Sequence, residues 1–310
     1  MVSRCDAGPD RWTTVGHRRG PFAHEKGAQM AGIDAARTTA GPAPLTAGMV
    51  ADYHRDGFLL LPGDHLPADV LAELIEAAPL ILAQEGPQRV LERDGVTVRS
   101  VYGPHRTDPV VARVSRSPEL AGAARQLLDD EVYVHQSKVN LKAAFAGDQW
   151  EWHQDYINWR DRDGIPRPDL VNVTVFLNEV NEFNGPLTFI PGSHRHGLLD
   201  GTDTDSMPAG YEDEPNWMAT LTATEKFQVD RTVIRRLAEA GGLVSPKGPA
   251  GSVLMFHPNV LHASSPNLSP FDRGMLLMVY NGVRNAPRPV ENPRPDFLAE
   301  RAVVPIPLAV

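Results

Sequence analysis

The chain has 310 residues, of which 42% are hydrophobic and 22% charged, and its formal net charge at pH 7 is -9. This composition is typical of a globular protein with a large buried core. The acidic balance argues against a nucleic-acid partner, which needs a basic surface, and no apolar run approaches the roughly 20 residues that span a membrane. Cys5 is the single cysteine, so no disulfide can form within the chain and we expect a cytoplasmic protein.

The N-terminal part of the chain divides into a leader and the start of a domain. Residues 1–44 are rich in Gly, Ala, Arg and Thr and lack apolar periodicity, so we expect a disordered leader. A single folded domain is predicted for residues 45–310. It should begin with a short helix over Leu45–His54, a strand over Gly57–Leu61 and a helix over Pro67–Gln84, where apolar residues recur at helical spacing.

Short strands dominate the pattern after Val90. The clearest are predicted at Glu131–Leu141, Leu170–Val180, Gly251–Phe256 and Gly274–Tyr280. In the second of them apolar and polar residues alternate, which predicts one packed face and one face turned toward something polar. Helices followed by many short strands favour a mostly β fold with flanking α-helices, whose core is a double-stranded β-helix, the cupin-like jelly roll.

Residues 199–250 interrupt this rhythm of strands. They begin with an acidic stretch and contain one expected helix, Arg231–Ala240. A long insertion between core strands is typical of a lid or binding loop, so we expect a lid here rather than a second domain. The proline-rich tail from Asn285 onward is expected to follow the surface without regular structure.

A candidate metal site lies in the run Trp150-Glu-Trp-His153-Gln-Asp155. Residues two apart on an extended chain point to the same side, so His153 and Asp155 can reach one ion. His262, from a distant strand, would complete the two histidines and one carboxylate with which oxygenases hold non-haem iron(II). His-x-Asp pairs are also common by chance, and a surface histidine beside an acid is the alternative. Four further histidines are expected to be structural or exposed: His135, His194, His196 and His257.

Residues after His262 point to an organic acid as cosubstrate. Arg273 lies near the start of a predicted strand, and its guanidinium group can bind a carboxylate through two hydrogen bonds. 2-Oxoglutarate offers such a carboxylate, and the hydroxyl group of Ser264 is predicted to face the same cavity. The alternative for Arg273 is an ion pair with Asp272 or another surface acid.

Several longer motifs resemble those of one enzyme family. They are Tyr133-Val-His-Gln-Ser-Lys-Val-Asn140, Trp152-His-Gln-Asp-Tyr-Ile-Asn-Trp159, Asn184-Gly-Pro-Leu-Thr-Phe-Ile-Pro-Gly-Ser-His194, and His262-Ala-Ser with Arg273. With these motifs the chain resembles the phytanoyl-CoA dioxygenase superfamily over roughly Leu45 to Pro295. Within it, the chain looks most like the ectoine hydroxylase branch and the free L-leucine hydroxylases of griselimycin-type peptide pathways.

The resemblance implies two sets of ligand-binding residues. Iron(II) is expected at His153, Asp155 and His262, the three residues already singled out. The cosubstrate 2-oxoglutarate, which reacts together with O2, is expected at a second set: Arg273, Ser264, Asn140, Gln136 and Trp150. For Trp150, plain core packing is the alternative.

The substrate pocket is where the chain departs from the ectoine enzymes. Trp159 and Phe256 match pocket residues of those enzymes, with core packing as the alternative. A second pocket phenylalanine is replaced here by Leu277, and a cyclic cation is poorly held without two aromatic walls, so ectoine is not the expected substrate. Asn158 and Arg160 stand where those enzymes carry other residues.

These two departures suggest how a different substrate is held. Arg160 is the candidate for a substrate carboxylate, and an ion pair with Asp161 or Asp163 is its alternative. Asn158 would bind the polar end of an amino acid or select a substrate with a further polar group, because a buried amide needs partners.

The predicted function is iron(II)- and 2-oxoglutarate-dependent hydroxylation of a side-chain carbon of a small free amino acid, in secondary metabolism. A leucine-like aliphatic L-amino acid is favoured. One alternative is a carrier-tethered or CoA-linked substrate, which the acidic start of residues 199–250 disfavours. Another, from a different class, is a jelly-roll binding protein with an idle metal site. The sequence identifies no protein partner.

Overall fold

The computed structural model describes residues 45–199, 201–203, 215, 217–218, 221 and 227–307. The expected leader and most of the acidic start of the expected lid lie outside these residues. The chain divides into two units, and every element described below belongs to the larger one, Gly41–Val310. Within the described residues, none of the helices is long and apolar enough to cross a membrane.

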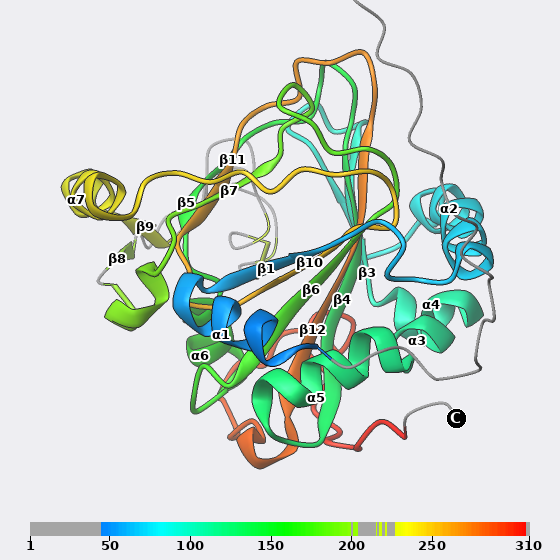
Figure 1. Ribbon diagram of the computed structural model, residues 1–310. Coiled ribbons are helices and arrows are strands. Elements are labelled where there is room, and N and C mark those ends of the chain that lie inside the picture. Colours follow the sequence, from blue (N-terminus) through cyan, green and yellow to red (C-terminus); the bar gives the residue numbers. More distant parts are fainter. Residues whose placement is uncertain are drawn as a thin grey trace, which may run out of the picture. The chain divides into compact units, whose positions relative to one another are not determined.

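A seven-stranded antiparallel sheet forms the main layer, with strand order β1-β10-β6-β12-β4-β3-β2 (Figure 1). Strands adjacent in this sheet are distant in the sequence, as in a jelly roll. The strands are β1 (Phe58–Leu61), β2 (Arg89–Leu91), β3 (Val98–Tyr102), β4 (Val132–Lys142), β6 (Leu170–Phe176), β10 (Val253–Phe256) and β12 (Arg273–Gly282).

A smaller antiparallel sheet completes the core. Its strand order is β5-β11-β7, with β5 spanning Trp150–His153, β11 His262–Ser264 and β7 Leu187–Phe189. Side chains from both sheets line one cavity, so the two sheets enclose it. The mostly β, jelly-roll prediction is confirmed. A separate ribbon of β8 (Gly201–Asp203) and β9 (Phe227–Val229) belongs to the expected lid.

Helices cover the face of the main sheet that is turned away from the cavity (Figure 1). They are α1 (Ala47–Asp56), α2 (Ala68–Leu82), α3 (Pro104–Thr107), α4 (Pro109–Val114) and α5 (Ala123–Leu128), with a π-helical turn at Pro118–Gly122 before α5. Two more helices, α6 (Tyr156–Asp163) and α7 (Arg231–Gly241), are not part of this helical layer.

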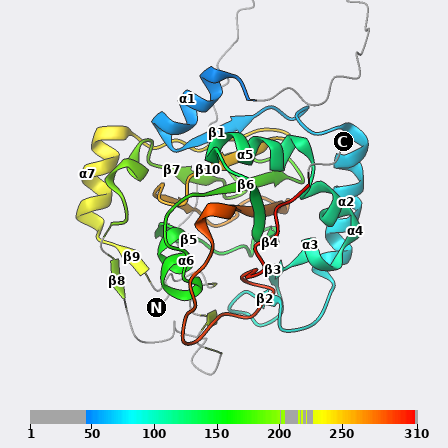
Figure 2. The same ribbon diagram turned by 90° about the horizontal axis from the view of Figure 1, so that it is seen from below.

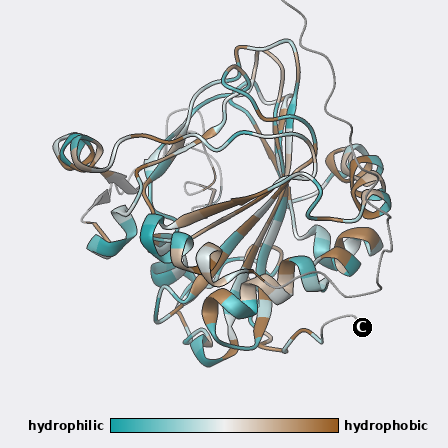
Figure 3. Ribbon diagram, viewed as in Figure 1, coloured by the Kyte–Doolittle hydropathy of each residue, from teal (hydrophilic) through white to brown (hydrophobic). Residues whose placement is uncertain are grey.

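The main hydrophobic core lies between these helices and the sheet. Val171, Val173 and Val175 of β6 pack there with helix residues such as Leu74 and Leu127. The central strands of the main sheet are accordingly largely brown in the hydropathy view of Figure 3. Burying one such side chain contributes roughly 1.5–3 kcal/mol. The alternating prediction for this strand is confirmed, because Asn172, on its other face, lines the cavity.

The strands and longer helices predicted from the sequence are present to within a few residues at their ends, whereas several short helices were not predicted. The most important of these is α6, which follows Asp155 directly. Its residues are polar or aromatic, so it lacks the apolar stripe by which a helix is recognised in a sequence. This helix carries Asn158 and Trp159, which line the cavity.

Candidate active site

The predicted metal ligands come together where β5 and β11 pair. His262 lies directly opposite His153 in the ladder, and Asp155 follows β5 by two residues. One ligand atom from each side chain lies within 4.8 Å of the others. Nε2 of His153 is 3.7 Å from Oδ1 of Asp155, and Nε2 of His262 is 3.8 Å from Oδ2. A single ion can therefore contact all three side chains.

Hydrogen bonds prepare these side chains for a metal ion. Nδ1 of His153 donates to the carbonyl oxygen of Glu151 at 2.6 Å, and Nδ1 of His262 donates to that of Val260 at 3.1 Å. Because a carbonyl can only accept, the proton of each ring lies on Nδ1, and Nε2 directs its lone pair toward the metal site. The amide of Asn172 donates to Oδ2 of Asp155 at 3.0 Å and orients the carboxylate. Two neutral imidazoles and one carboxylate fit iron(II).

The three ligands face the cavity between the two sheets, which has a volume of about 80 Å³. Of the predicted cosubstrate and substrate residues, eight also line it: Gln136, Asn140, Trp150, Asn158, Trp159, Phe256, Arg273 and Leu277. Two predicted residues, Ser264 and Arg160, do not. An apolar cluster backs the metal site, since the rings of Phe189 and Phe256 lie 5.7 and 5.1 Å from that of His262.

Arg273 brings a buried positive charge to the cavity. Its guanidinium group, which is 2% exposed, donates to Oδ1 of Asn140 at 3.0 Å and to the carbonyl oxygen of Gly185 at 2.6 Å. Among the described residues it has no carboxylate partner, and its Nε is buried without a hydrogen bond. The alternative partner, Asp272, instead accepts from the backbone of Ala144. Burial, together with the nearby Arg99, lowers the pKa of Arg273 to about 9. An incoming carboxylate would supply the missing counter-charge.

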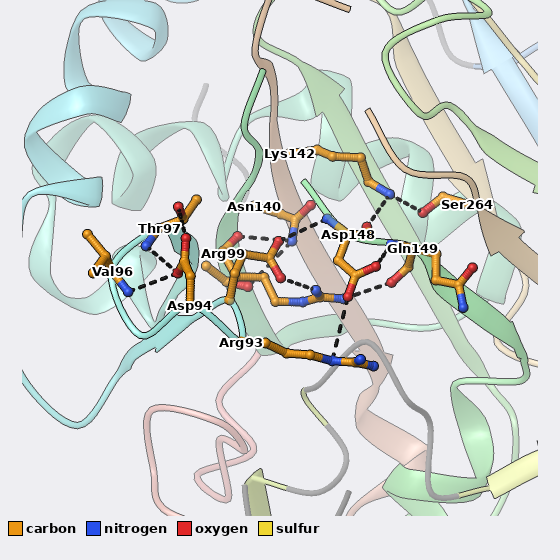
Figure 4. Close-up of polar contacts among 12 residues, drawn as sticks. Arg93, Asp94, Val96, Thr97, Arg99, Asn140, Lys142, Asp148, Gln149 and Ser264 are labelled. Atoms are coloured by element: carbon orange, nitrogen blue, oxygen red, sulfur yellow. Dashed lines mark hydrogen bonds and ion pairs between the residues drawn. The ribbon is translucent and has the colours of Figure 1, made fainter. Parts of the chain in front are cut away.

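Two further basic residues, not predicted from the sequence, interact electrostatically with Arg273. They are Lys142 and Arg99, both labelled in Figure 4. Lys142 donates from Nζ to the carbonyl oxygens of Asp148 and Ser265 at 2.8 and 2.6 Å and to the hydroxyl of Ser264 at 2.8 Å. Burial, with the charges of Arg273 and Arg99, lowers its pKa to about 6. Lys142 shares one face of β4 with Gln136, Lys138 and Asn140, so the two-residue period could have identified it.

Arg99 stacks on the ring of Trp150. It pairs with Glu92 at 2.6 Å, and its guanidinium carbon lies 3.9 Å from the centre of the Trp150 ring. The tryptophan is thereby held between a cation on one side and the cavity on the other.

The position of Ser264 corrects one prediction. Its hydroxyl accepts a hydrogen bond from Lys142 and does not line the cavity. The two-residue spacing from His262 predicted a shared face of β11, but not that the buried ammonium group of Lys142 would bind this hydroxyl.

Arg160 corrects a second prediction. Its guanidinium group forms hydrogen bonds of 2.6 and 3.0 Å with Asp161, and the side chain is 46% exposed. The alternative, a surface ion pair, is therefore what the structure contains. Arg160 points away from the cavity because it follows Trp159 directly in α6, and adjacent residues of a helix point in different directions.

We expect Arg160→Ala to change the KM values for substrate and cosubstrate by less than about twofold and the free energy of unfolding by less than about 1 kcal/mol, since exposed ion pairs contribute little. Steady-state kinetics and thermal unfolding test this. A large rise in KM for the amino acid alone would return Arg160 to the substrate site.

Arg294 is a third basic residue near the cavity that was not predicted from the sequence. It lies in the tail predicted to follow the surface, yet it is 4% exposed and lines the cavity. The tail runs beside β4 (red in Figure 2), where Glu300 N–H donates to the carbonyl oxygen of His135 at 2.8 Å. The amide of Gln136 also donates to the carbonyl oxygen of Leu298 at 2.7 Å. The tail has no helix or strand over residues 286–307, as predicted, but it is not confined to the surface, since Arg294 and Leu298 are buried. The contacts that bury them are too distant in sequence to form a local pattern.

Asn158 and Trp159 reach the cavity from α6. Trp159 is buried and packs edge-on against the ring of His135, with 6.2 Å between the ring centres. The side-chain oxygen of Asn158 is buried and accepts no hydrogen bond from the part of the chain that the structure describes. A buried acceptor of this kind is costly unless a ligand supplies the donor.

Comparisons with known proteins agree with this geometry. The model of the phytanoyl-CoA dioxygenase (PhyH) family matches residues 53–275. L-proline trans-4-hydroxylase from Streptomyces griseoviridis is 41% identical over 267 residues, which cover 85% of this chain and 96% of that protein. Ectoine dioxygenase from Bordetella bronchiseptica is 37% identical over 265 residues, 83% of each chain.

Solved structures are similar as well. The crystal structure of EctD from S. alaskensis with 2-oxoglutarate and 5-hydroxyectoine superposes with a TM-score of 0.70 at 35% identity and covers 85% of this chain and 86% of that one. The structure of EctD from S. alaskensis with bound Fe has a TM-score of 0.71 at 33% identity and covers 88% and 89%. The motifs of the sequence, the family match and the arrangement of the site thus agree, and this chain belongs to the phytanoyl-CoA dioxygenase family.

Proposed function

We propose that this protein is an iron(II)- and 2-oxoglutarate-dependent dioxygenase that hydroxylates a small free L-amino acid. The observation that carries the proposal is one cavity in which a His-Asp-His metal site is combined with two separate buried arginines, Arg273 and Arg294. Arg273 reaches the cavity from β12 and donates to Asn140 of β4, whereas Arg294 reaches it from the tail and donates to Asp163 of α6. The two guanidinium groups are held by different partners, so each can bind a carboxylate of its own.

Each arginine suits one of the two organic acids. Arg273, with Asn140 beside it, would bind the carboxylate of 2-oxoglutarate that lies away from the iron. Arg294 would bind the carboxylate of the amino acid, and the unpaired oxygen of Asn158 would accept a hydrogen bond from its amino group. Trp159, Phe256 and Leu277 would pack against the apolar side chain.

When bound, iron(II) and 2-oxoglutarate supply the oxidising chemistry with which O2 converts a carbon–hydrogen bond to an alcohol, while the cosubstrate becomes succinate and carbon dioxide. The residues of this chain hold and orient the reactants. His153, Asp155 and His262 would hold the iron(II) through two imidazole nitrogens and one carboxylate. The aromatic side chains of the cavity, including Trp150, exclude water from the site.

The side chain of the amino acid is the least constrained part of the proposal. The resemblance to L-leucine hydroxylases favours an aliphatic substrate of leucine size, in secondary metabolism, and the similarity to an L-proline hydroxylase adds proline as a candidate. The apolar wall that Leu277, Met275 and Val279 of β12 contribute suits either side chain. The presence of Leu277 in place of a second pocket phenylalanine remains the argument against ectoine.

We also propose that residues 199–250 form a lid and that the enzyme acts in the cytoplasm. Leu221 lines the cavity, and the ring of Trp217 packs edge-on against Phe297 of the tail, with 5.8 Å between centres. Both contacts support a lid that closes over bound substrate.

A panel of possible substrates tests the proposed function. Purified protein with iron(II) and 2-oxoglutarate is incubated with L-leucine, L-proline, ectoine, the amides of both amino acids and a carrier-linked amino acid, and succinate is measured. We expect one or both free amino acids to stimulate succinate formation, and their amides to be much poorer. Stimulation by the carrier-linked compound alone would contradict a free amino-acid substrate.

Asn158→Val tests the proposed contact with the amino group. Losing a hydrogen bond to a charged group costs roughly 1.5–3 kcal/mol, so the KM for the amino acid should rise about 10- to 150-fold. The KM for 2-oxoglutarate should stay unchanged, which serves as the internal control. If turnover of the best amino acid is unaffected, Asn158 is peripheral to the substrate.

A further inference from the structure

Arg294 belongs to a buried ionic cluster with Asp163 and His135. Asp163, the last residue of α6, receives hydrogen bonds from Nε of Arg294 at 2.8 Å and from Nη2 at 2.5 Å, one on each carboxylate oxygen. Nε2 of His135 donates to the same carboxylate at 2.9 Å. All three side chains are buried. The pair of parallel hydrogen bonds fixes both the plane and the direction of the guanidinium group.

Asp163 is held as a carboxylate. Burial alone would raise the pKa of Asp163, but the charge of Arg294 and the hydrogen bonds from His135 and Arg294 lower it to about 2. The ring of His135 contributes its Nε2 to this carboxylate, while its Nδ1 is buried without a hydrogen-bond partner among the described residues. Among the described residues, Nη1 of Arg294 makes no hydrogen bond, and this nitrogen remains for a ligand in the cavity.

The end of α6 is shaped to receive the tail. Gly164, which ends the helix with φ 77°, accepts a hydrogen bond from the backbone N–H of Arg288 at 2.9 Å. A Cβ atom at Gly164 would lie 2.1 Å from the carbonyl oxygen of Arg288, so only glycine allows this approach. The tail itself has no strand or helix around Arg294. Its guanidinium group therefore depends on Asp163 for its orientation.

We propose that Asp163, backed by His135, is a positioning residue that aims Arg294 at the substrate and so makes the enzyme selective for substrates with a free carboxylate. This rests on the proposed function, in which Arg294 binds that carboxylate. Helix α6 starts directly after the metal ligand Asp155. It carries Trp159 of the pocket wall and, four residues later on the same face, Asp163, which orients Arg294.

The test compares the free amino acid with its amide, which lacks the negative charge. For each variant the ratio of kcat/KM for acid over amide is measured. Asp163→Asn should lower this ratio at least about tenfold, because a misplacement of about 1 Å can cost on the order of 100-fold. The KM for 2-oxoglutarate should not change. Asp161→Asn, the same change at the exposed end of the Arg160 ion pair, is the matched control and should leave the ratio intact.

A double-mutant cycle separates positioning from a general structural role. Arg294→Gln should abolish the preference for the acid, and adding Asp163→Asn to it should lower the ratio no further, because both residues act through one contact. Asp163→Glu keeps the charge and serves as the second variant if Asp163→Asn does not fold. It displaces the guanidinium group, so it should also lower the ratio.

The outcomes distinguish the inference from the proposed function. If Arg294→Gln abolishes the preference while Asp163→Asn and Asp163→Glu retain it, positioning by Asp163 is wrong and the carboxylate site stands. If Arg294→Gln itself keeps the preference, both the inference and the assignment of Arg294 are wrong. A variant of Asp163 that loses stability and turnover on acid and amide equally would show a structural role alone and would also overturn the inference.

Discussion

Asp155→Ala and His153→Ala are each expected to abolish amino-acid-dependent turnover of 2-oxoglutarate. The three ligand atoms lie within 4.8 Å of one another, and the histidine rings are held by backbone carbonyls with Nε2 turned toward the site. Loss of an outer partner of a metal ligand already costs about 10- to 100-fold in affinity or activity, so loss of a ligand should exceed 100-fold. Calorimetric titration with iron(II) under anaerobic conditions measures the loss of binding directly, independently of activity.

The control for this prediction is His196→Ala, which removes an exposed histidine outside the cavity and should change neither metal affinity nor turnover. Asn172→Ala should have an intermediate effect, because Asn172 orients Asp155 without contacting the ion. Full activity of either ligand variant, or of the wild-type protein after exhaustive chelation, would contradict the metal site.

The second large effect is expected from Arg273→Ala, which should raise the KM for 2-oxoglutarate far more than that for the amino acid. Truncating one partner of a buried, hydrogen-bonded charge pair costs roughly 2–5 kcal/mol, which corresponds to about 30- to 4,000-fold. Arg273 suits this role because it is buried and, among the described residues, unpaired with any acid. Titration of 2-oxoglutarate at saturating amino acid gives the two constants separately.

Arg273→Lys is the matched variant for this measurement. It keeps the charge but not the two-pronged geometry, so its KM for 2-oxoglutarate should lie between those of the wild type and Arg273→Ala. An unchanged dependence on 2-oxoglutarate in Arg273→Ala would assign the cosubstrate carboxylate to another cation, and Lys142, which lies close by, would be the first to consider.

The parts of the site that obey strand periodicity could be predicted from the sequence. Gln136 and Asn140 lie four residues apart in the predicted strand Glu131–Leu141, a spacing that puts both on one face, and both line the cavity. His153 and Asp155, two residues apart, do reach one point in space. A strand repeats every two residues, so that local spacing alone decides which side chains share a face. The pairing of His262 with His153 across the ladder needed the family motifs as well.

The remaining parts depend on irregular or long-range structure. The hydroxyl of Ser264 is bound by the distant Lys142 and does not line the cavity, and an unrecognised helix turned Arg160 into solvent. Arg294 reaches the cavity only because the tail docks on Gly164 and beside β4, through contacts that span more than a hundred residues of sequence. The order of the strands in the main sheet is set in the same way, by packing rather than by local pattern.

The most direct test of the proposed function is mass spectrometry of a reaction run under isotopically labelled O2. The protein is supplied with iron(II), 2-oxoglutarate and a mixture of free L-amino acids that includes leucine and proline. We predict a product that is one oxygen atom heavier than one of these amino acids and carries the label, formed together with succinate and absent for Asp155→Ala. If no free amino acid gains labelled oxygen while a carrier-bound or CoA-linked compound does, the protein is not a free amino-acid hydroxylase.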